Sequence, residues 1–588
     1  MANASRGGAG GAGTARRICG LMVPYAPQVA LACVLAVLTV VATLLLPVLS
    51  GRAVDAVVGP GDVDYATLAS TARVMAVAIV ACALTQWGLT AVSNKIVYGM
   101  VFDLRTQAFA KIQRLPLSYI DRTGHGDVVA RVVTDVDQFS NGLILAFQQF
   151  LTGALTIVLT LVFMARLNLV VTAVVLCVTP LSYVAAKTIA SKSYRHFGDV
   201  TAARGELTSI AEETILGAQT VAAFDMQDAV CERFERVDAA LGASRERAVF
   251  ISSLTNPTTR FINSLVYAGV GIVGAFLVLG GTMTVGSLSA FLGYANQYTK
   301  PFNDISEVVT ELQNSFACAQ RLFDLLDERD EPADATDAVA LGDVRGRVEL
   351  ADVCFSYVPE RPLIRDVSLV AEPGQRIAIV GPTGCGKTTL INLLMRFYDI
   401  DGGAIRIDGH DVRSVTRESL RAAFGMVLQD TWIRQGTVRD NIAMARPDAT
   451  DEEVREAARA AYADRFIEQL PQRYETVVGG DTTALSAGQR QLLCIARVML
   501  ARPRMLILDE ATSNIDTRTE LKVQRAFDRL MEGRTSFVVA HRLSTIVGAD
   551  KIVAMRDGRV VEVGTHEELL ARGGFYAGLY ESQFESSA

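Results

Sequence analysis

The sequence has few charges, few cysteines and no surplus of basic residues. Charged residues make up 20% of the 588 residues, and 63 acidic residues against 56 Lys and Arg give a net charge of −7. Nucleic-acid binding is therefore not expected, because proteins of that class carry a basic stripe or patch. The nine cysteines show neither a disulfide framework nor zinc-ligand spacing, which excludes the disulfide-stapled secreted class and suits a reducing compartment.

Hydrophobic residues, in contrast, make up half of the chain, and the mean hydropathy is +0.29. This composition is typical of a protein that spans a membrane. The first apolar run carries no charge, and at about 1.5 Å per residue it can cross a hydrocarbon core of about 30 Å. It also exceeds the apolar core of a cleaved signal peptide. Six spans are predicted: Val29–Leu49, Val74–Val92, Leu143–Phe163, Leu169–Ala186, Phe261–Gly281 and Val285–Tyr298.

The connections between these spans are of two kinds. The basic residues of the short connections are only Arg52, Arg73 and Arg166. The two long connections, after spans two and four, are rich in Lys and Arg. By the positive-inside rule, the long connections, both termini and the C-terminal part face the cytoplasm. The expected location is the cytoplasmic membrane. Apolar residues at helical spacing predict that membrane helices continue into the long connections, with tips near residues 116–126 and 211–224.

Composition also divides the chain into four parts. Residues 1–17, rich in Gly and Ala, are predicted to form a flexible tail, and residues 18–326 a six-span helical domain. Residues 327–346 are acidic and rich in turn formers, as expected for a solvated linker. Residues 347–588 contain the nucleotide-binding motif described next.

The pattern G-x-x-x-x-G-K-[ST] begins at Gly381, directly after the apolar run 377–380, which is predicted to be a buried strand. In this strand–loop–helix context, glycines let successive backbone N–H groups point at phosphate oxygens, and the following helix adds its positive end. Lys387 is placed to reach the β- and γ-phosphates, and Thr388 to coordinate Mg²⁺. A chance glycine loop is the alternative, but the context speaks against it. The predicted phosphate-binding residues are Gly381, Thr383, Gly384, Cys385 (a small filler), Gly386, Lys387, Thr388 and Thr389.

A second predicted strand, residues 505–508, ends in the carboxylates of Asp509 and Glu510. Asp509 is expected to hold Mg²⁺, and Glu510 to polarise a water for attack on the γ-phosphate. Two solvated acids at a strand end would be the ordinary interpretation in isolation. Beside a phosphate loop, the catalytic interpretation is favoured.

Downstream, Leu485-Ser486-Ala487-Gly488-Gln489 precedes a helix expected to start near Arg490. This stretch is similar to the signature sequence of ATP-binding cassette (ABC) transporters, and the C-terminal domain resembles their nucleotide-binding domain. The resemblance implies that Ser486, Gly488 and Gln489 contact ATP held by a partner cassette, so that two cassettes enclose two nucleotides. It also implies roles for four further residues: Tyr357 stacking on adenine, Gln429 contacting Mg²⁺ and water, His541 contacting the γ-phosphate, and Asp516 coupling the two sites.

The membrane half resembles exporter-type ABC half-transporters, so that the resemblance covers essentially residues 18–580. Three positions depart from the usual family pattern: Ala487 in the signature, Gly480 in place of a glutamate that touches the membrane helices, and Asn514, which resembles one subunit of heterodimeric members. Homodimer and heterodimer both remain open, with the heterodimer slightly favoured. The positions that carry the membrane-half resemblance are Arg105, Gly124, Arg131, Asp135, Gly217, Phe224, Pro301 and Arg321.

Together these features predict a multidomain membrane protein, with a six-helix all-α transmembrane domain followed by an α/β P-loop ATPase domain of ABC type. The expected function is ATP-driven export of an amphipathic or hydrophobic solute, with ATP and Mg²⁺ as cofactors and a second half-transporter as partner. An importer on the same fold, or a membrane-tethered ATPase without transport, are the alternatives. The predicted catalytic residues are Glu510, His541, Gln429 and Lys387, and the predicted Mg²⁺ ligands are Thr388, Gln429 and Asp509.

Overall fold

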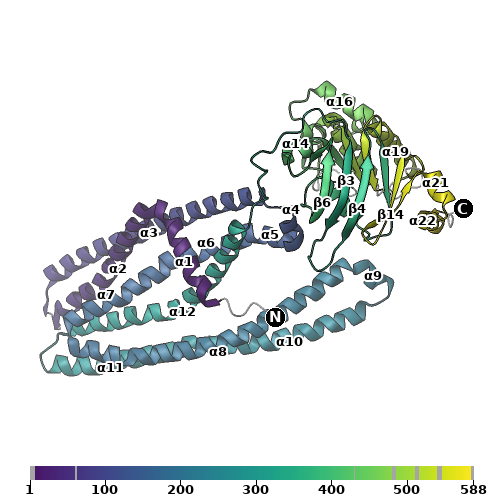
Figure 1. The fold of residues 1–588 in the computed structure, drawn as a ribbon. Helices are drawn as coiled ribbons and strands as arrows, with labels where there is room; N and C mark the ends of the chain where they lie inside the picture. Colours follow the sequence, from purple (N-terminus) through teal and green to yellow (C-terminus); the bar gives the residue numbers. More distant parts are fainter. Residues whose placement is uncertain are drawn as a thin grey trace. The chain divides into compact units, whose positions relative to one another are not determined.

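The computed structural model describes residues 7–59, 62–428, 431–479, 485–509, 516–539 and 546–584. The chain folds as two compact units. The helical unit comprises Met1–Arg114 and Thr123–Glu328, and the ATPase unit comprises Leu115–Arg122 and Arg329–Ala588 (Figure 1). The eight residues 115–122 thus belong with the ATPase unit although they interrupt the helical unit in sequence.

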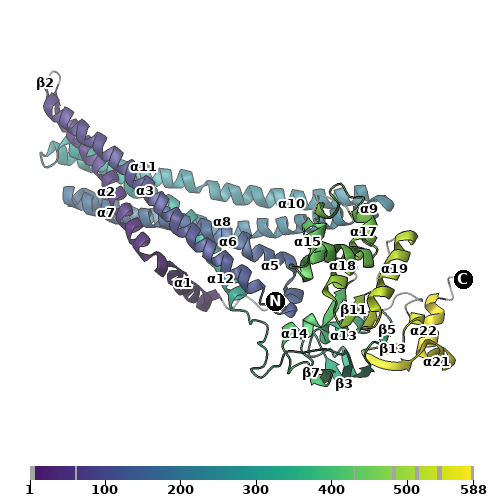
Figure 2. The same cartoon turned by 90° about the horizontal axis from the view of Figure 1, so that it is seen from above.

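Long helices make up the helical unit, as predicted. Helix α3 continues 20 residues past the predicted end of its span, and α8 and α12 are also much longer than a membrane crossing requires. Helix α10 runs beside one part of α8, and α11 lies beside another part of it (Figure 1 and Figure 2). The elements are α1 (Gly7–Met22), α2 (Ala26–Asp55), β1 (Val57–Gly59), β2 (Asp62–Val63), α3 (Tyr65–Ile112), α5 (His125–Val132), α6 (Thr134–Leu145), the π-helical turn η2 (Ala146–Leu151), α7 (Thr152–Leu167), α8 (Leu169–Leu216), α9 (Ala218–Ala223), α10 (Gln227–Ser253), α11 (Thr255–Leu279) and α12 (Val285–Asp327).

Four helical stretches in the described part of the chain are long and apolar enough to cross a membrane: residues 13–55, 65–112, 125–167 and 227–279. They contain predicted spans one, two and three, and span five except for its last two residues. Predicted span four lies in α8, and among the residues whose side chains are described its apolar stretch is Leu169–Pro180. Predicted span six lies in α12 and becomes polar after its first 11 residues, at Asn296 and Gln297.

Residues 7–17 of the predicted N-terminal tail form the first part of α1. Contacts with the end of α12 explain the order. Thr14 donates a hydrogen bond to the Gln320 side chain, the Arg17 guanidinium binds both carboxylate oxygens of Asp327, and the same guanidinium lies 4.4 Å from the centre of the Phe323 ring. These partners are about 300 residues apart in sequence, so the local Gly/Ala composition did not reveal them.

Helices α2 and α12 approach each other closely at two glycines. A Cβ atom on Gly286 would lie 2.0 Å from the Gly51 carbonyl oxygen, and a Cβ on Gly51 would lie 2.3 Å from the Gly286 oxygen. Next to this contact the Asp55 carboxylate accepts the Gly286 N–H at 2.6 Å and the Thr284 hydroxyl at 2.8 Å. Glycine allows two backbones to meet in this way, as is common between membrane helices.

The ATPase unit contains a six-stranded sheet in the order β14-β13-β5-β12-β11-β8, parallel except for the antiparallel edge strand β14. A four-stranded antiparallel sheet has the order β4-β3-β6-β7. The strands of the six-stranded sheet are β5 (Arg376–Val380), β8 (Phe424–Val427), β11 (Met505–Asp509), β12 (Thr535–Val539), β13 (Lys551–Arg556) and β14 (Arg559–Gly564), and those of the second sheet are β3 (Val348–Phe355), β4 (Ile364–Ala371), β6 (Gly402–Ile407) and β7 (His410–Asp411).

Strand β5 is buried on both faces, which explains its continuous apolar sequence. Ile377 and Ile379 join the core that contains the four-stranded sheet, whereas Ala378 and Val380 point to the opposite face and pack with the C-terminal helices. A separate core joins the helical part of the unit to β8 and β11. The other elements of the ATPase unit are α4 (Leu117–Thr123), α13 (Lys387–Leu394), α14 (Arg417–Ala422), β9 (Gly436–Thr437), α15 (Val438–Ile442), α16 (Asp451–Ala460), α17 (Asp464–Ile467), β10 (Val477–Val478), α18 (Ala487–Ala501), α19 (Thr517–Met531), α21 (His566–Ala571) and α22 (Phe575–Phe584).

Residues 331–334 of the predicted linker are held to the ATPase unit by ion pairs and hydrogen bonds. The Arg417 side chain is 8% exposed, and its guanidinium donates to Asp334 at 2.8 Å and to the Pro332 carbonyl at 2.7 Å. Arg421 pairs with Glu331 at 2.6 Å. A buried arginine needs such partners, because an unpaired buried charge is costly. The acidic residues of this segment therefore serve as counter-ions.

Candidate nucleotide-binding site

The phosphate loop connects β5 to α13, as the motif predicts. Gly381 and Gly386 have φ angles of +154° and +102°, and Gly386 is the N-cap of α13. A Cβ on Gly381 would lie 2.3 Å from the Met555 carbonyl oxygen, and one on Gly386 would lie 2.6 Å from the Ile364 side chain. Both positions therefore require glycine for the backbone angle, and Gly381 also for space, because its neighbour is a backbone atom.

The positive charge of Lys387 lies inside this loop. Its Nζ donates to the Gly381 carbonyl at 2.8 Å and to the Pro382 carbonyl at 3.0 Å. Lys387 and Thr388 are the first two residues of α13, and the Thr389 side chain is buried. The ammonium group and the N-terminus of α13 thus contribute positive potential at one place, which suits a polyphosphate.

Cys385 is buried within the same loop, with 4% of its surface exposed. Burial raises the pKa of the Cys385 thiol, although the nearby Lys387 charge acts in the opposite direction. A thiol with a raised pKa is protonated at neutral pH and is a poor nucleophile. We therefore expect Cys385 to fill space in the loop rather than to act as a nucleophile.

Asp509 ends the buried strand β11 and is itself 8% exposed. In the parallel register Asp509 pairs with Val539 of β12, and Val539 pairs with Ile379 of β5. Asp509 therefore lies level with Ile379, near the end of β5, where the phosphate loop begins. Strand β12 lies between the two strands. A carboxylate and the Thr388 hydroxyl are the hard oxygen donors that Mg²⁺ prefers, so the residues present fit the ion.

Three predicted catalytic residues, Gln429, Glu510 and His541, lie outside the described residues. The strands that lead to them are described: β8 ends at Val427, β11 at Asp509 and β12 at Val539. These strands are parallel neighbours in the order β12-β11-β8. Their carboxyl ends share the edge of the sheet from which the phosphate loop also leaves, which is the usual ligand-binding edge of such sheets.

Tyr357 follows β3 and belongs to a cluster of three aromatic rings. Its centroid lies 4.9 Å from that of Phe355 and 5.0 Å from that of Tyr398, and all three pairs meet edge to face. Tyr357 as a whole remains 47% exposed, so that its ring can stack on a base. Tyr398 was not predicted from the sequence, because an isolated tyrosine after a helix usually packs in a core.

The signature segment begins α18 at Ala487, three residues before the predicted start at Arg490. A capping box explains the earlier start: Ser486 Oγ accepts the Gln489 N–H at 3.3 Å, and Gln489 Oε1 accepts the Ser486 N–H at 2.9 Å. Ser486 is exposed and Gly488 is buried at this helix terminus.

Asp516 caps α19 by accepting the Thr519 N–H at 3.0 Å. Its hydrogen bonds with Thr519 lower the pKa of the Asp516 carboxyl. Ser486 and Asp516 thus have local capping roles that do not depend on a partner subunit.

In the helical unit, residues that share the family pattern form ion pairs. Arg321 of α12 donates to Asp135 of α6 at 2.7 Å, and the Asp135 carboxylate is 8% exposed on its side chain. Arg105 pairs with Asp137 at 2.5 Å and Arg131 with Asp127 at 2.6 Å. The first two pairs join α6 to α12 and to α3, whereas Arg131 and Asp127 lie one turn apart within α5.

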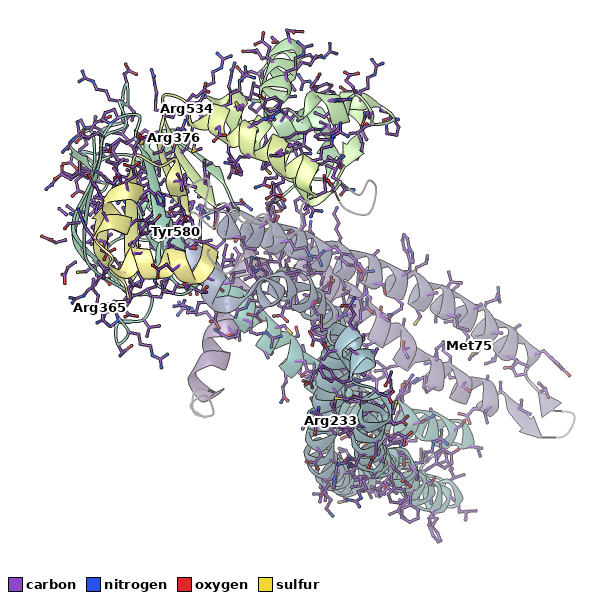
Figure 3. The ribbon with its side chains drawn as sticks, turned by 90° about the vertical axis from the view of Figure 1, so that its right-hand side faces the viewer. Met75, Arg233, Arg365, Arg376, Arg534 and Tyr580 are labelled. Carbon is purple, nitrogen blue, oxygen red and sulfur yellow. The ribbon has the colours of Figure 1, made fainter. Side chains whose placement is uncertain are left out.

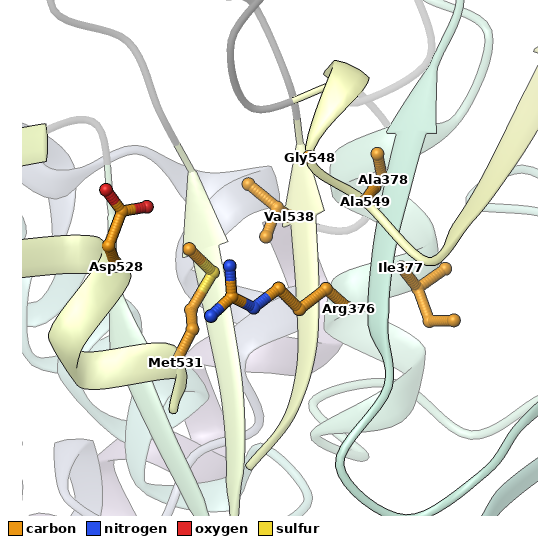
Figure 4. Close-up of a pocket in the computed structure, with 8 residues that line it drawn as sticks. All are labelled: Arg376, Ile377, Ala378, Asp528, Met531, Val538, Gly548 and Ala549. Carbon is orange, nitrogen blue, oxygen red and sulfur yellow. The ribbon is translucent and has the colours of Figure 1, made fainter. Parts of the chain in front are cut away.

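A small cavity of about 30 Å³ lies elsewhere in the ATPase unit. It is lined by Arg376 at the start of β5 and by Asp528 and Met531 of α19 (Figure 4). Arg376 pairs in register with Ser536 of β12, near Arg534 (Figure 3). This is the amino edge of the parallel strands, opposite to the phosphate loop, and the volume suits one or two waters rather than a nucleotide.

Comparison with known proteins agrees with the geometry. Residues 29–302 match the family model of the ABC transporter transmembrane region, and residues 364–513 match that of the ABC transporter. The "Fatty acid ABC transporter ATP-binding/permease protein" of Mycobacterium tuberculosis is 44% identical over 518 residues, which cover 88% of this chain and 82% of that protein. The "ATP-dependent lipid A-core flippase" of Syntrophus aciditrophicus is 34% identical over 574 residues, covering 97% and 94%.

A solved structure of similar fold is titled "Structure of a bacterial Atm1-family ABC exporter with ATP bound". It matches with a TM-score of 0.77 and 30% identity, and the match covers 95% of this chain and 98% of that one. The predicted fold class is thereby confirmed. The chain belongs to the ABC transporter family, as an exporter-type half-transporter that pairs with a second half and couples ATP hydrolysis to transport through a multi-pass membrane domain.

Proposed function

We propose that this half-transporter exports an amphipathic, lipid-like solute from the cytoplasm. The observation that carries the proposal is the intact phosphate loop, with Lys387 inside it and Asp509 buried at the same sheet edge, fused to apolar helical stretches. Relatives named for fatty acids and for lipid A-core support a lipidic solute. Nearly charge-free spans support it too, because charged solutes usually require intramembrane charges.

The roles of the site residues follow from their positions. Lys387 and the N-terminus of α13 bind the β- and γ-phosphates, and Tyr357 stacks on the adenine. Mg²⁺, held by Thr388, Asp509 and Gln429, would neutralise phosphate charge as the bond to the γ-phosphate breaks. The remaining catalytic residues act on water and phosphate: Glu510 orients the attacking water, and His541 contacts the γ-phosphate.

We further propose that Ser486, Gly488 and Gln489 reach the ATP of the second half-transporter, with Asp516 between the two sites. Both termini and the ATPase unit lie in the cytoplasm, and the membrane is the cytoplasmic one. For the partner we favour a different half-transporter over a second copy, because Asn514 resembles one subunit of heterodimeric members. Purification of the tagged chain from its natural host, followed by mass spectrometry, tests this. Recovery of untagged copies of this chain alone would contradict a heterodimer.

Transport is tested in proteoliposomes with ATP added outside. Only the molecules whose ATPase units lie on the outside of the vesicle can then bind ATP. A fluorescent fatty acid and a fluorescent phospholipid are the probes, and Glu510→Gln is the matched inactive control. Accumulation of a probe inside the vesicles with the native chain, but not with Glu510→Gln, supports export. ATP-dependent loss of a preloaded probe would indicate an importer, and hydrolysis without movement of either probe would indicate an ATPase with no lipid transport.

A further inference from the structure

Tyr398 lies where three parts of the ATPase unit meet. It follows α13, whose first residue is Lys387 of the phosphate loop. Its ring meets the ring of Tyr357, and its hydroxyl donates a hydrogen bond to the Asp121 carboxylate on α4. Helix α4 is the tip of the first long cytoplasmic connection, and it is continuous in sequence with membrane-spanning helices on both sides.

We propose that Tyr398 is a positioning residue that couples the adenine-contacting ring of Tyr357 to α4. The inference rests on the proposed function, in which Tyr357 stacks on the base of ATP. Nucleotide binding then changes the position of the Tyr398 ring, and the bond to Asp121 passes this change to the chain that leads into the membrane.

The ring geometry supports a direct link. The planes of Tyr357 and Tyr398 are 89° apart and those of Phe355 and Tyr398 are 62° apart, with centroids separated by 5.0 and 5.6 Å. Edge-to-face pairs have a preferred geometry because the positive ring edge faces the negative ring face. A rotation of Tyr357 onto adenine therefore changes the best position of the Tyr398 ring.

The backbone around the rings makes the link stiff. The Asp401 carboxylate accepts the Ser356 N–H at 2.7 Å, and the Asp401 N–H donates to the Cys354 carbonyl at 2.9 Å. These two bonds tie the segment after Tyr398 to the segment before Tyr357. Asp399 also accepts from Arg396 at 2.9 Å, which fixes the exit of α13.

The contact with α4 is specific. Burial raises the pKa of the Tyr398 phenol, and the bond to Asp121 raises it further, so that the hydroxyl is protonated and donates at neutral pH. On the α4 side, Tyr119 is 5% exposed, which shows that α4 is packed rather than loosely placed. A hydrogen bond to a charged acceptor is among the stronger kinds and has a defined direction.

The test uses the full-length chain, together with its partner where one co-purifies, in lipid nanodiscs. Hydrogen–deuterium exchange of the peptide that covers residues 115–123 is measured with and without ATP, and binding of a fluorescent ATP analogue is measured in parallel. Tyr398→Phe keeps the ring and removes the hydroxyl, and Asp121→Asn weakens the acceptor. Tyr474→Phe is the matched control, because Tyr474 donates a similar bond to Asp464 at 2.7 Å elsewhere in the same unit.

We expect ATP to change exchange of this peptide in the native chain and in Tyr474→Phe. In Tyr398→Phe and in Asp121→Asn the ATP-dependent change should fall by at least threefold, with nucleotide affinity within about twofold of the native value because the aromatic pair is kept. The double variant Tyr398→Phe/Asp121→Asn should lose no more than either single variant, because both remove one interaction. Tyr398→Leu should additionally weaken ATP binding, by about 2- to 10-fold.

An unchanged ATP response in Tyr398→Phe, or additive losses in the double variant, would overturn the inference. Tyr357→Ala separates this outcome from a failure of the proposed site. If Tyr357→Ala binds the ATP analogue as well as the native chain, the adenine assignment itself is wrong. If it binds weakly while Tyr398→Phe responds normally to ATP, only the coupling role of Tyr398 is wrong.

Discussion

Replacing Gly286 with alanine should destabilise the helical unit, because α2 and α12 touch there through their backbones. The added Cβ would lie 2.0 Å from the Gly51 oxygen and 2.4 Å from the Asp55 carboxylate carbon. Side-chain Cβ atoms essentially never approach closer than 3.0 Å, so the helices must separate by about 1 Å. Overpacking of this kind costs about 1–3 kcal/mol. Separation also stretches the bond from the Gly286 N–H to Asp55, now 2.6 Å long.

Helix propensity alone predicts the opposite sign, since alanine is favoured over glycine by about 1 kcal/mol inside a helix. This contrast makes Gly271→Ala a sharp control: Gly271 also lies in a membrane helix, and no atom lies within 4 Å of its virtual Cβ. In thermal unfolding of the detergent-solubilised protein, Gly286→Ala should unfold several degrees lower, and Gly271→Ala at the native temperature or above. Equal midpoints for Gly286→Ala and the native chain would refute the close-contact explanation.

Three further outcomes are expected. Glu510→Gln should bind ATP with near-native affinity but hydrolyse it at least 100-fold more slowly, because the water-orienting carboxylate is lost; near-normal turnover would remove Glu510 from that role. Lys387→Ala should weaken ATP binding by 10-fold or more, whereas Lys551→Ala, which removes a similar lysine–carbonyl bond of 2.7 Å elsewhere in the unit, should not; equal affinities would contradict the phosphate-loop assignment. In single-cysteine variants, Cys385 should react with maleimide much more slowly at pH 7 than the exposed Cys231, and its rate should still be rising above pH 9, because its pKa is raised; a rate that levels off below pH 8 would contradict the raised pKa.

The parts of the structure that the sequence predicted are those determined by local pattern. The phosphate loop from Gly381 to Thr388 and the strand before it have a fixed spacing, and the extension of α3 beyond its predicted span follows from its apolar periodicity. The helical tips were also expected, and Gly124, with a φ angle of +81°, begins α5 at one of them.

The features that were missed depend on partners distant in the chain. The sequence near Arg17 does not indicate that Asp327 is its partner. The composition of the acidic linker likewise does not indicate that Asp334 pairs with the buried Arg417. Tyr398 was missed for the same reason, since its partners Tyr357 and Asp121 lie 41 and 277 residues away. Local composition carries no record of such pairings.

Because residues 115–122 belong to the ATPase unit, this unit cannot be produced complete as one continuous C-terminal fragment. A fragment that starts at residue 329 would lack a piece of its own surface, and the Tyr398 hydroxyl would meet water where Asp121 now accepts its hydrogen bond. Catalytic rates obtained from such a fragment would describe an ATPase that lacks the contact between Tyr398 and Asp121. Adding back a peptide of residues 115–123 should restore part of the missing surface, and with it the native response to nucleotide.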